Sequence, residues 1–269
     1  MIPDFNKLRI SRISNMNNMN NMNNMNKLIL ILSLLLSQLS LSQKIMSWNI
    51  QNLGESKFKK DSIIPQIYQV IKSTNVDIVA IQEVSTSKYG DSCIIELANL
   101  LDYNWTISLK TTGDGSERYA FLYRKSFKLK WSNLDKNIED SINREPFIAC
   151  FKIKKKELIV RQVHLVPTSK HPENEVSKLY YLDGIICGDF NLSCENDSFK
   201  QLKSKFNSTI CSNPTSLKRN GDISENSYDH FLVDKSYFIK KSEVYFYPYL
   251  WNRNILSDHL PILINIEKK

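Results

Sequence analysis

A four-residue motif after an apolar run constrains this chain more than any other feature. The motif Gly-Asp-Phe-Asn occupies residues 188–191 and directly follows the apolar run 185–187. An apolar run that stops at polar residues is typical of a buried strand whose end opens into a site. Side chains two apart on an extended segment share a face, so Asp189 and Asn191 are predicted to face one phosphate, water or metal. A strand end followed by an Asx turn would account for the same residues.

Four further segments place polar side chains beside apolar runs in the same way. The polar residues are Asn49, Glu83, His164 and the pair Asp258-His259. Side chains that bind metal or transfer protons, repeated at separate strand ends, indicate one site assembled from across the fold.

These residue types suit the hydrolysis of a phosphodiester. That reaction needs a nucleophilic water, an acid for the departing alkoxide, and donors or positive charge for the phosphoryl oxygens. Glu83, with Asn49 beside it, offers the hard oxygen ligands that Mg²⁺ takes in proteins. His164 and His259 are two of only four histidines, and a pair of histidines flanking one site favours proton transfer over core packing.

In these motifs the chain resembles the endonuclease/exonuclease/phosphatase superfamily, and within it the deoxyribonuclease I-like secreted nucleases. The resemblance extends from about residue 44 to residue 267. Besides the His164 strand, the matching stretches are WNIQNLGESK at 48–57, IQEV at 81–84, ERYAFLYR at 117–124, NREPF at 143–147, GDFN at 188–191, SYDHFLV at 227–233 and SDHLP at 257–261. Each is weak alone, but all occur in the order of the family.

The resemblance implies a role for each proton-transfer residue. His259 would be the general base that activates water, with Asp189 as its acidic partner. His164 would act as the acid or as a donor to phosphate, paired with Glu117.

The resemblance also implies the metal and phosphate ligands. Asp258 would join Glu83 and Asn49 at a site for Mg²⁺, with Mn²⁺ as a substitute and Ca²⁺ as a structural ion. The scissile phosphate would be bound by Asn49 and Asn191.

Three more residues follow from the resemblance. Asp229 and Tyr228 would complete the surroundings of the scissile phosphate, with Asp229 among the catalytic residues. Arg144 would contact the DNA backbone, since its planar guanidinium suits phosphate oxygens.

The element pattern predicts an α/β fold, which the resemblance specifies as a four-layer α/β/β/α sandwich of two mixed β-sheets flanked by helices. Strands are expected at 44–49, 77–82, 105–109, 119–123, 127–131, 147–153, 158–164, 184–187, 231–233, 243–247 and 262–266. Helices are expected at 63–73, 92–101, 173–182 and 197–206. Many strands with few helices favour two packed sheets with helices outside.

The first 43 residues are predicted to be a leader, and residues 44–269 the catalytic domain. A Met-Asn-Asn run at 16–26 cannot bury a core. The cationic start at Lys27, the apolar run 28–36 and the small residues after it form a secretory signal peptide pattern, cut after Ser42 or Gln43. A membrane anchor would need roughly 20 apolar residues. We therefore expect a secreted or periplasmic monomer that has no stable membrane association after cleavage.

Net charge and cysteine content say less about function than the motifs do. Removing residues 1–43 lowers the formal charge from +8 to +5, which suits a polyanion such as DNA but also an ordinary solvated surface. Five cysteines cannot all pair. Cys150 and Cys187 lie in strand patterns and are expected to be buried thiols. The resemblance implies a disulfide at Cys194, for which Cys211 is the nearest downstream partner.

Two departures from the family keep other functions open. Ser85 and Gly115 stand where deoxyribonuclease I has an arginine and a tyrosine that read the minor groove, so single strands or RNA are alternatives to duplex DNA. Only 24 residues separate His164 from Asp189, and a ten-residue helix there spans about 15 Å, barely a crossover. The alternatives are an inactive nucleic-acid-binding copy, or a phosphatase or phosphodiesterase acting on phospholipids or phosphoinositides.

Overall fold

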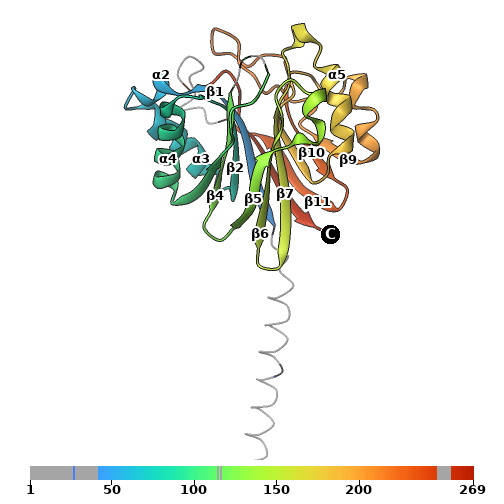
Figure 1. The fold of residues 1–269 in the computed structure, drawn as a ribbon, viewed down its shortest axis with the longest axis horizontal. Helices are drawn as coiled ribbons and strands as arrows, with labels where there is room; N and C mark the ends of the chain where they lie inside the picture. Colours follow the sequence, from blue (N-terminus) through green and yellow to red (C-terminus); the bar gives the residue numbers. More distant parts are fainter. Residues whose placement is uncertain (1–26, 28–41, 114, 116, 247–255) are drawn as a thin grey trace, which may run out of the picture. The chain divides into compact units, whose positions relative to one another are not determined.

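Two six-stranded β-sheets lie face to face at the centre of the protein (Figure 1). The computed structural model describes residue 27 and residues 42–113, 115, 117–246 and 256–269. Residues 42–269 form one compact unit. Most of the predicted leader and the end of the strand expected at 243–247 lie outside the described residues. None of the helices in the described ranges is long and apolar enough to cross a membrane.

Each sheet contains one parallel pair among antiparallel neighbours. The first sheet has the order β11 (Tyr237–Val244), β12 (Ile262–Lys268), β1 (Gln43–Leu53), β2 (Ile78–Val84), β4 (Arg118–Arg124) and β3 (Tyr103–Ile107), with β1 and β2 parallel. The second has the order β5 (Lys128–Leu134), β6 (Phe147–Ile153), β7 (Lys156–His164), β8 (Ile185–Asp189), β10 (Asp229–Asp234) and β9 (Phe206–Thr209), with β7 and β8 parallel. Both sheets are therefore mixed, as predicted.

Helices cover the outer face of each sheet, which confirms the four-layer sandwich. Helices α3 (Ile63–Thr74) and α4 (Lys88–Leu101) pack on the first sheet, and the short helix α2 (Glu55–Phe58) lies beside them. Helix α5 (Glu173–Val176) and several 3₁₀ turns pack on the second sheet. Between the sheets lies a third cluster that includes Phe121 in ring contact with Phe147 and Phe151. Burying these apolar faces is the main force that holds the layers together.

The helix expected at 173–182 is wrong in length and in type. Helix α5 has only four residues and passes into a 3₁₀ helix at Ser177–Tyr181. The buried residues Val176, Leu179 and Leu182 are spaced by three. A 3₁₀ helix has three residues per turn, so residues spaced by three align on one face. In an α-helix they would share a face less closely.

The helix expected at 197–206 is also wrong. Short 3₁₀ turns at Asp197–Phe199 and Leu202–Ser204 occupy this segment, and Phe206 begins strand β9. β9 pairs with β10, with Phe206 opposite Asp234. Pairing with the sheet edge therefore overrides the helical pattern of the sequence.

The eleven predicted strands all overlap strands of the structure, and β9 is a twelfth among the described residues. The strand expected at 243–247 begins earlier, at Tyr237. A register shift between Ile239 and Lys241 interrupts the alternation of this strand, and that interruption hides its first half from a pattern of period two.

The short connection between β7 and β8 still allows them to pair. They pair in parallel from Val160 opposite Ile185 to His164 opposite Asp189. The tight 3₁₀ path and the αL conformation of Gly184 (φ 76°) return the chain to the sheet within the available length.

Cysteine placement agrees with the sequence. Cys194 and Cys211 form a disulfide with Cα atoms 5.0 Å apart, which confirms the pairing implied by the resemblance. Cys150 and Cys187 are buried free thiols, as predicted, and so is Cys93.

Candidate active site

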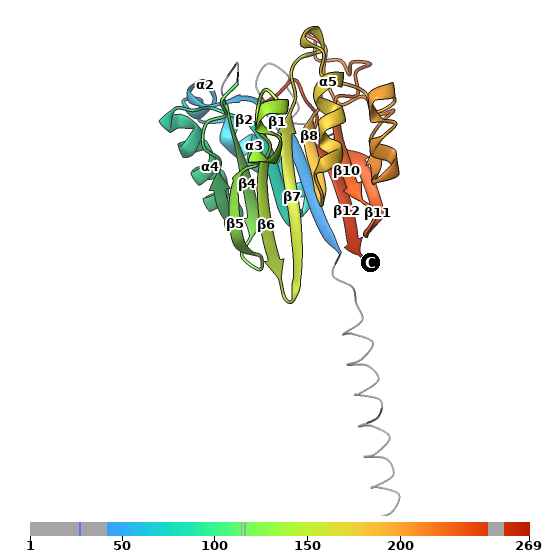
Figure 2. The same cartoon turned by 45° about the vertical axis from the view of Figure 1, so that its right-hand side comes forward.

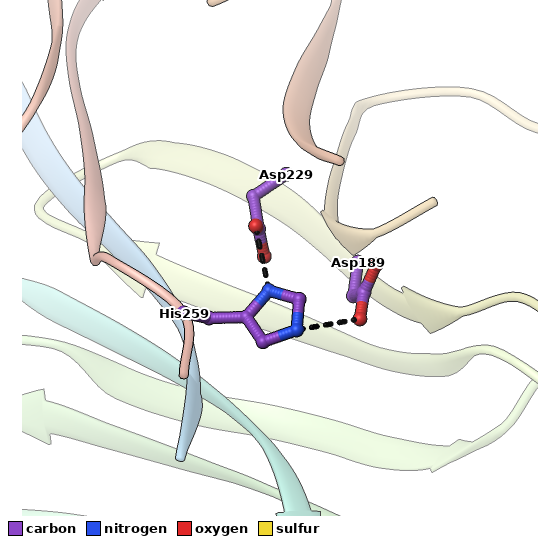
Figure 3. Close-up of side chains that lie close together, drawn as sticks. All are labelled: Asp189, Asp229 and His259. Atoms are coloured by element: carbon purple, nitrogen blue, oxygen red, sulfur yellow. Dashed lines mark hydrogen bonds and ion pairs between the residues drawn. The ribbon is translucent and has the colours of Figure 1, made fainter. Parts of the chain in front are cut away.

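Four strand ends and one loop meet at one end of the two sheets. Asp189 is the last residue of β8, and the β-sheet pairs it with His164 at the end of β7 and with Asp229 at the start of β10. His259 enters from the loop before β12 and faces Asp189 and Asp229 (Figure 3). The sheet register thus places residues from distant parts of the sequence within contact distance.

His259 lies between two carboxylates. Its Nδ1–H donates to Asp229 Oδ2 at 2.9 Å, and its Nε2 is 3.5 Å from Asp189 Oδ2 (Figure 3). Burial alone would lower the pKa of His259, but Asp229 and then Asp189 raise it well above the ordinary value. Asp229 therefore holds the ring in one tautomer and stabilises its protonated form.

His164 makes a second, similar pair. Its Nδ1–H donates to Glu117 Oε1 at 2.7 Å, and its Nε2 is also 3.5 Å from Asp189 Oδ2. Burial opposes protonation of His164, yet the negative charge and hydrogen bond of Glu117 raise its pKa overall. The predicted pairing of His164 with Glu117 is confirmed.

The pKa values of Asp189 and Asp229 are shifted in opposite directions. Burial favours the neutral acid at Asp189, but His259, His164 and hydrogen bonds lower the pKa of its carboxyl group. At Asp229 burial has the larger effect, and the pKa is raised although His259 opposes it. Asp229 Oδ1 is buried and has no hydrogen-bond partner. Of these two carboxyl groups, Asp189 is thus the one that ionises more readily.

The expected acidic partner of His259 needs a correction. Asp189 was predicted in that role, but the His259 Nδ1–H donates to Asp229 at 2.9 Å, and Asp189 faces the other ring nitrogen at 3.5 Å. The reason is the antiparallel pairing of β8 and β10, which puts Asp229 opposite Asp189 and gives His259 a carboxylate on each side.

Glu83 reaches the site because strand β2 is irregular there. Its φ is 60°, and the pairing of β2 with β4 shifts register between Ile81 and Val84. Glu83 Oε1 accepts from Asn49 Nδ2 at 2.9 Å, and Oε2 accepts from the Asn52 backbone N–H at 2.9 Å. The carboxylate is therefore held by donors and directed away from the covered face of the sheet.

Asn49 presents nitrogen, not oxygen, to its acidic neighbours. Its Nδ2 donates to Glu83 Oε1 and, at 3.1 Å, to Asp189 Oδ2, while its Oδ1 accepts from the Gln51 backbone N–H at 3.0 Å. In this arrangement Asn49 orients the two carboxylates, and its role as a metal ligand stays a prediction.

Asp258 lies on the Glu83 side of the site. Its Oδ2 accepts from Gln51 Nε2 at 3.0 Å. The buried Lys57 donates from Nζ to the Leu256 carbonyl at 2.6 Å. Burial lowers the pKa of Lys57 to about 8, although Glu83 and Asp258 both raise it. The sequence did not single out Lys57 or Gln51, but Gln51 lies two residues after Asn49 on a strand, a spacing that predicts a shared face.

A divalent cation fits the Glu83 side better than the histidine side. Among the described residues, donor atoms of Asp189, Asp229 and His259 lie within 4.8 Å of one another. The His259 Nδ1 is already committed to Asp229, so this trio offers few free ligands. Glu83 borders an open hollow of about 630 Å³, where water and substrate oxygens can complete the coordination that Mg²⁺ prefers.

The hollow also contains the two positions that depart from the family. Ser85 and Gly115 line it together with Glu83 and Glu117. Both lining side chains are small, so space remains open directly beside the two acidic residues of the site.

Three predicted phosphate ligands make protein contacts instead. Arg144 is buried and donates from Nε to the His164 carbonyl at 2.8 Å and from Nη2 to the Leu165 carbonyl at 2.6 Å. Its Nη1 lies 3.7 Å from Glu117 Oε2. The buried guanidinium thus braces the loop behind His164, and the contact of Arg144 with DNA stays a prediction.

The other two of these residues, Asn191 and Tyr228, lie next to the site through their backbones. The Asn191 N–H donates to Asp189 Oδ1 at 2.8 Å, and its side-chain Nδ2 donates to the Leu165 carbonyl at 3.0 Å. The Tyr228 carbonyl accepts from the Phe190 N–H at 2.8 Å. Both residues therefore support the turn that carries Asp189.

The loop that carries His259 is anchored by three hydrogen bonds. Ser257 Oγ donates to the Asn49 carbonyl at 2.6 Å and accepts from the His259 N–H at 3.0 Å. Trp48 Nε1 donates to the His259 carbonyl at 3.0 Å. The buried anchors fix the imidazole relative to β1, which is how a loop residue becomes part of a preorganised site.

The fold and this pair of histidine–carboxylate contacts define a class of hydrolase. A family model described as the Endonuclease/Exonuclease/phosphatase family matches residues 46–259, so the chain belongs to that family. An endonuclease/exonuclease/phosphatase family protein from Bacteroides thetaiotaomicron has the same fold, with a TM-score of 0.65 and 18% identity over 86% of this chain and 99% of that one.

Among individual proteins, the chain is similar to mammalian deoxyribonucleases. It is 32% identical to deoxyribonuclease-1 of Bos taurus over 200 residues, which are 63% of this chain and 67% of that protein. It is 29% identical to deoxyribonuclease-1-like 1 of Cricetulus griseus over 60% of this chain and 59% of that protein. The alignments thus span about three fifths to two thirds of these relatives. Family and relatives together support a nuclease or phosphodiesterase.

Proposed function

We propose that this protein is a divalent-metal-dependent endonuclease that hydrolyses phosphodiester bonds of DNA. The observation that carries the proposal is the pair of histidines that face Asp189 Oδ2 through Nε2 at 3.5 Å each, while their Nδ1 atoms are held by separate carboxylates. Two oriented imidazoles on either side of one position suit a reaction that takes one proton and gives another.

His259 is the proposed general base. In its neutral form, Nε2 takes a proton from the attacking water, and the Asp229 carboxylate stabilises the imidazolium that results. His164 is the proposed acid: held by Glu117, it donates its Nε2 proton to the departing alkoxide. The firm negative charge of Asp189 keeps both rings facing the same position.

Glu83 is the proposed metal ligand. Asn49 and the Asn52 N–H fix its carboxylate at the edge of the hollow, and Asp258 adds a second negative charge on the same side. When bound, Mg²⁺ or Mn²⁺ would supply Lewis-acid stabilisation of the phosphoryl oxygens.

DNA is the proposed substrate because the chain is similar in sequence to deoxyribonucleases. The formal charge of +5 that remains without residues 1–43 favours association with a polyanion. The retained histidines and carboxylates support an enzyme rather than an inactive copy, since the loss of any one of them would cripple such a site.

Export is a further part of the proposal. Cleavage after Ser42 would leave strand β1 whole, because its first residue Gln43 pairs with Ile266. N-terminal sequencing of protein recovered outside the producing cell tests this: a start at Gln43 or Lys44 supports it, and an intact Met1 contradicts it.

The proposed activity is tested by nicking of supercoiled plasmid with Mg²⁺, with Mg²⁺ plus Ca²⁺, and with EDTA. We expect metal-dependent nicking that EDTA abolishes. Phosphoinositide and phospholipid substrates are assayed in parallel. Cleavage of these with no nicking would replace the nuclease by a phosphatase or lipid phosphodiesterase, and no turnover by a folded protein would indicate a binding protein.

A further inference from the structure

The ends of strands β5, β6 and β7 that lie away from the histidines form a face rich in lysine. Lys128 on β5 lies opposite Lys152 on β6, and Lys152 lies opposite Glu157 on β7. Residues opposite each other in antiparallel strands point to the same face. We define the lysine face by the exposed residues Lys128, Lys130, Lys152, Lys154 and Lys155. In Figure 2 the lower parts of these strands face the viewer with no helix in front.

Within strands β5, β6 and β7 the lysine face has little compensating negative charge, although Asp183 and Asp234 line a hollow beside Glu157. Glu157 is the only acidic residue in β5, β6, β7 and the turn between β6 and β7. It pairs with Lys130 at 2.6 Å, and that hydrogen bond, followed by the charges of Lys130, Lys152 and Lys268, lowers its pKa. Like charges directly opposite each other weaken a sheet, so the Lys128–Lys152 pair does not serve stability. An excess of positive charge on an open face suits a polyanion.

An exposed tryptophan on the same face narrows the choice of polyanion. Trp131 lies opposite Cys150, two residues from Lys152, so its side chain shares the face with the lysines. The residue is 43% exposed. Lysines alone would suit any anionic surface, but an open indole beside them provides a stacking platform for an unpaired base.

The separation from the histidines matches a polymer rather than a small ligand. Seven residue steps along β7 separate Glu157 from His164, about 23 Å at 3.3 Å per residue. A strand that keeps the duplex rise of about 3.4 Å per phosphate spans that distance with roughly seven nucleotides, and a more extended single strand spans it with fewer. A long substrate can therefore reach both places, whereas a short one cannot.

We propose that the lysine face, together with Trp131, is a second binding site for single-stranded nucleic acid, separate from the cleavage site. The proposal rests on the proposed function only in taking the bound polymer to be the substrate. It strengthens the binding of long strands and leaves the chemical step unchanged.

The test measures the binding of a fluorescent 30-nucleotide oligo(dT) to the full chain in EDTA, which prevents cleavage. The triple variant K128Q/K152Q/K155Q is expected to bind at least about tenfold more weakly, with a salt dependence smaller by about two in log–log slope. The control K178Q/K200Q/K203Q removes the same charge from exposed lysines elsewhere. Equal weakening by both triples, or by neither, would overturn the proposal.

A second pair of variants tests the proposed stacking of bases on Trp131. Trp131→Ala is expected to weaken oligo(dT) binding at least about fivefold, and Trp105→Ala, which is equally exposed at 43% on β3, is expected to change nothing. Melting temperatures verify folding, and the triple Lys→Arg variant should bind normally. If the glutamine triple loses only binding to phosphatidylserine vesicles, the face is a lipid site and the proposal fails.

Cleavage assays separate this proposal from the nuclease function. On a trinucleotide, which is too short to reach both places, the glutamine triple should match the unaltered protein. On long single strands its KM should rise and its kcat should not. A protein that cuts nothing would contradict the nuclease function yet leave the binding result in EDTA interpretable.

Discussion

The two histidine–carboxylate pairs make similar contacts on either side of Asp189, yet their surroundings differ. His164 and His259 each direct Nε2 to Asp189 Oδ2 at 3.5 Å and Nδ1 to a second carboxylate. Glu117 on one side is also near the Arg144 guanidinium, at 3.7 Å. Asp229 on the other side keeps one oxygen with no hydrogen-bond partner. The difference shows how one geometry can give two proton affinities. The Arg144 cation offsets the negative charge beside His164, and the described residues place no such cation beside His259.

A third histidine shows what burial does without a direct carboxylate contact. His230 follows Asp229 on β10, is fully buried, and packs against Phe190 and Phe199. Its Nε2–H donates to the Leu192 carbonyl at 2.7 Å, and its Nδ1 has no partner. Burial lowers its pKa to about 4. The carboxylates, not the depth of burial, therefore make His164 and His259 basic.

Removing either imidazole should have the largest effect. His259→Ala and His164→Ala each delete one proton-transfer group, so we expect cleavage to fall by about 10²–10⁴-fold. Plasmid nicking under saturating Mg²⁺ measures the loss, and circular dichroism verifies folding. Full activity in either variant would remove that residue from the mechanism.

Neutralising Glu83 tests the proposed metal site, which lies beside the two pairs. Glu83→Gln keeps the size of the side chain but removes the ligand charge, so we expect about a 10²–10³-fold loss and a higher Mg²⁺ requirement. Titration calorimetry with Mn²⁺ measures affinity directly. Glu55→Gln, on the same hollow but paired with Lys59, is the matched control and should bind metal normally.

The pH dependence should separate the two pairs. If His259 is the base, activity rises with pH as it deprotonates, and Asp229→Asn should move this rising limb to lower pH because Asp229 raises the pKa of His259. If His164 is the acid, Glu117→Gln should move the falling limb to lower pH for the same reason. Profiles of kcat/KM provide the measurement, and exchanged limbs would reverse the two roles.

The smallest effect on activity is expected at His230, where stability changes instead. Its folded pKa of about 4 lies below the ordinary histidine value of 6.5, so the unfolded chain binds the proton first as the pH falls. Its contribution to stability is therefore present above pH 6.5 and is lost between about 6.5 and 4, by roughly 3 kcal/mol. Urea unfolding of His230→Phe should show a weaker acid loss than the unaltered protein, and identical pH profiles would contradict this.

Much of the fold was predictable because the strands that build it carry clear apolar runs. The strand ends at Asn49, Glu83 and His164 identified the site because buried strands expose polar residues only where they end. The helical layer that covers the second sheet was less predictable. There the spacing of Val176, Leu179 and Leu182 fits both helix types on paper, and only packing against the sheet chooses the 3₁₀ form.

The roles of the site residues were harder to predict than which residues belong to the site. Arg144 and Asn191 occupy motif positions, but backbone carbonyls near His164 take their donors. Such contacts depend on where loops pass, which a linear pattern does not encode. The choice of Asp229 over Asp189 as the Nδ1 partner likewise depends on cross-strand register.

The irregular end of β2 has a consequence for how this protein can be altered. A non-glycine residue with φ of 60° stores conformational strain of about 1 kcal/mol or more, and here that residue is Glu83. A glycine at this position would relieve the strain while deleting the metal ligand. Selection for thermal resistance alone would therefore favour Glu83→Gly. This single substitution would give a more stable protein that lacks the metal ligand.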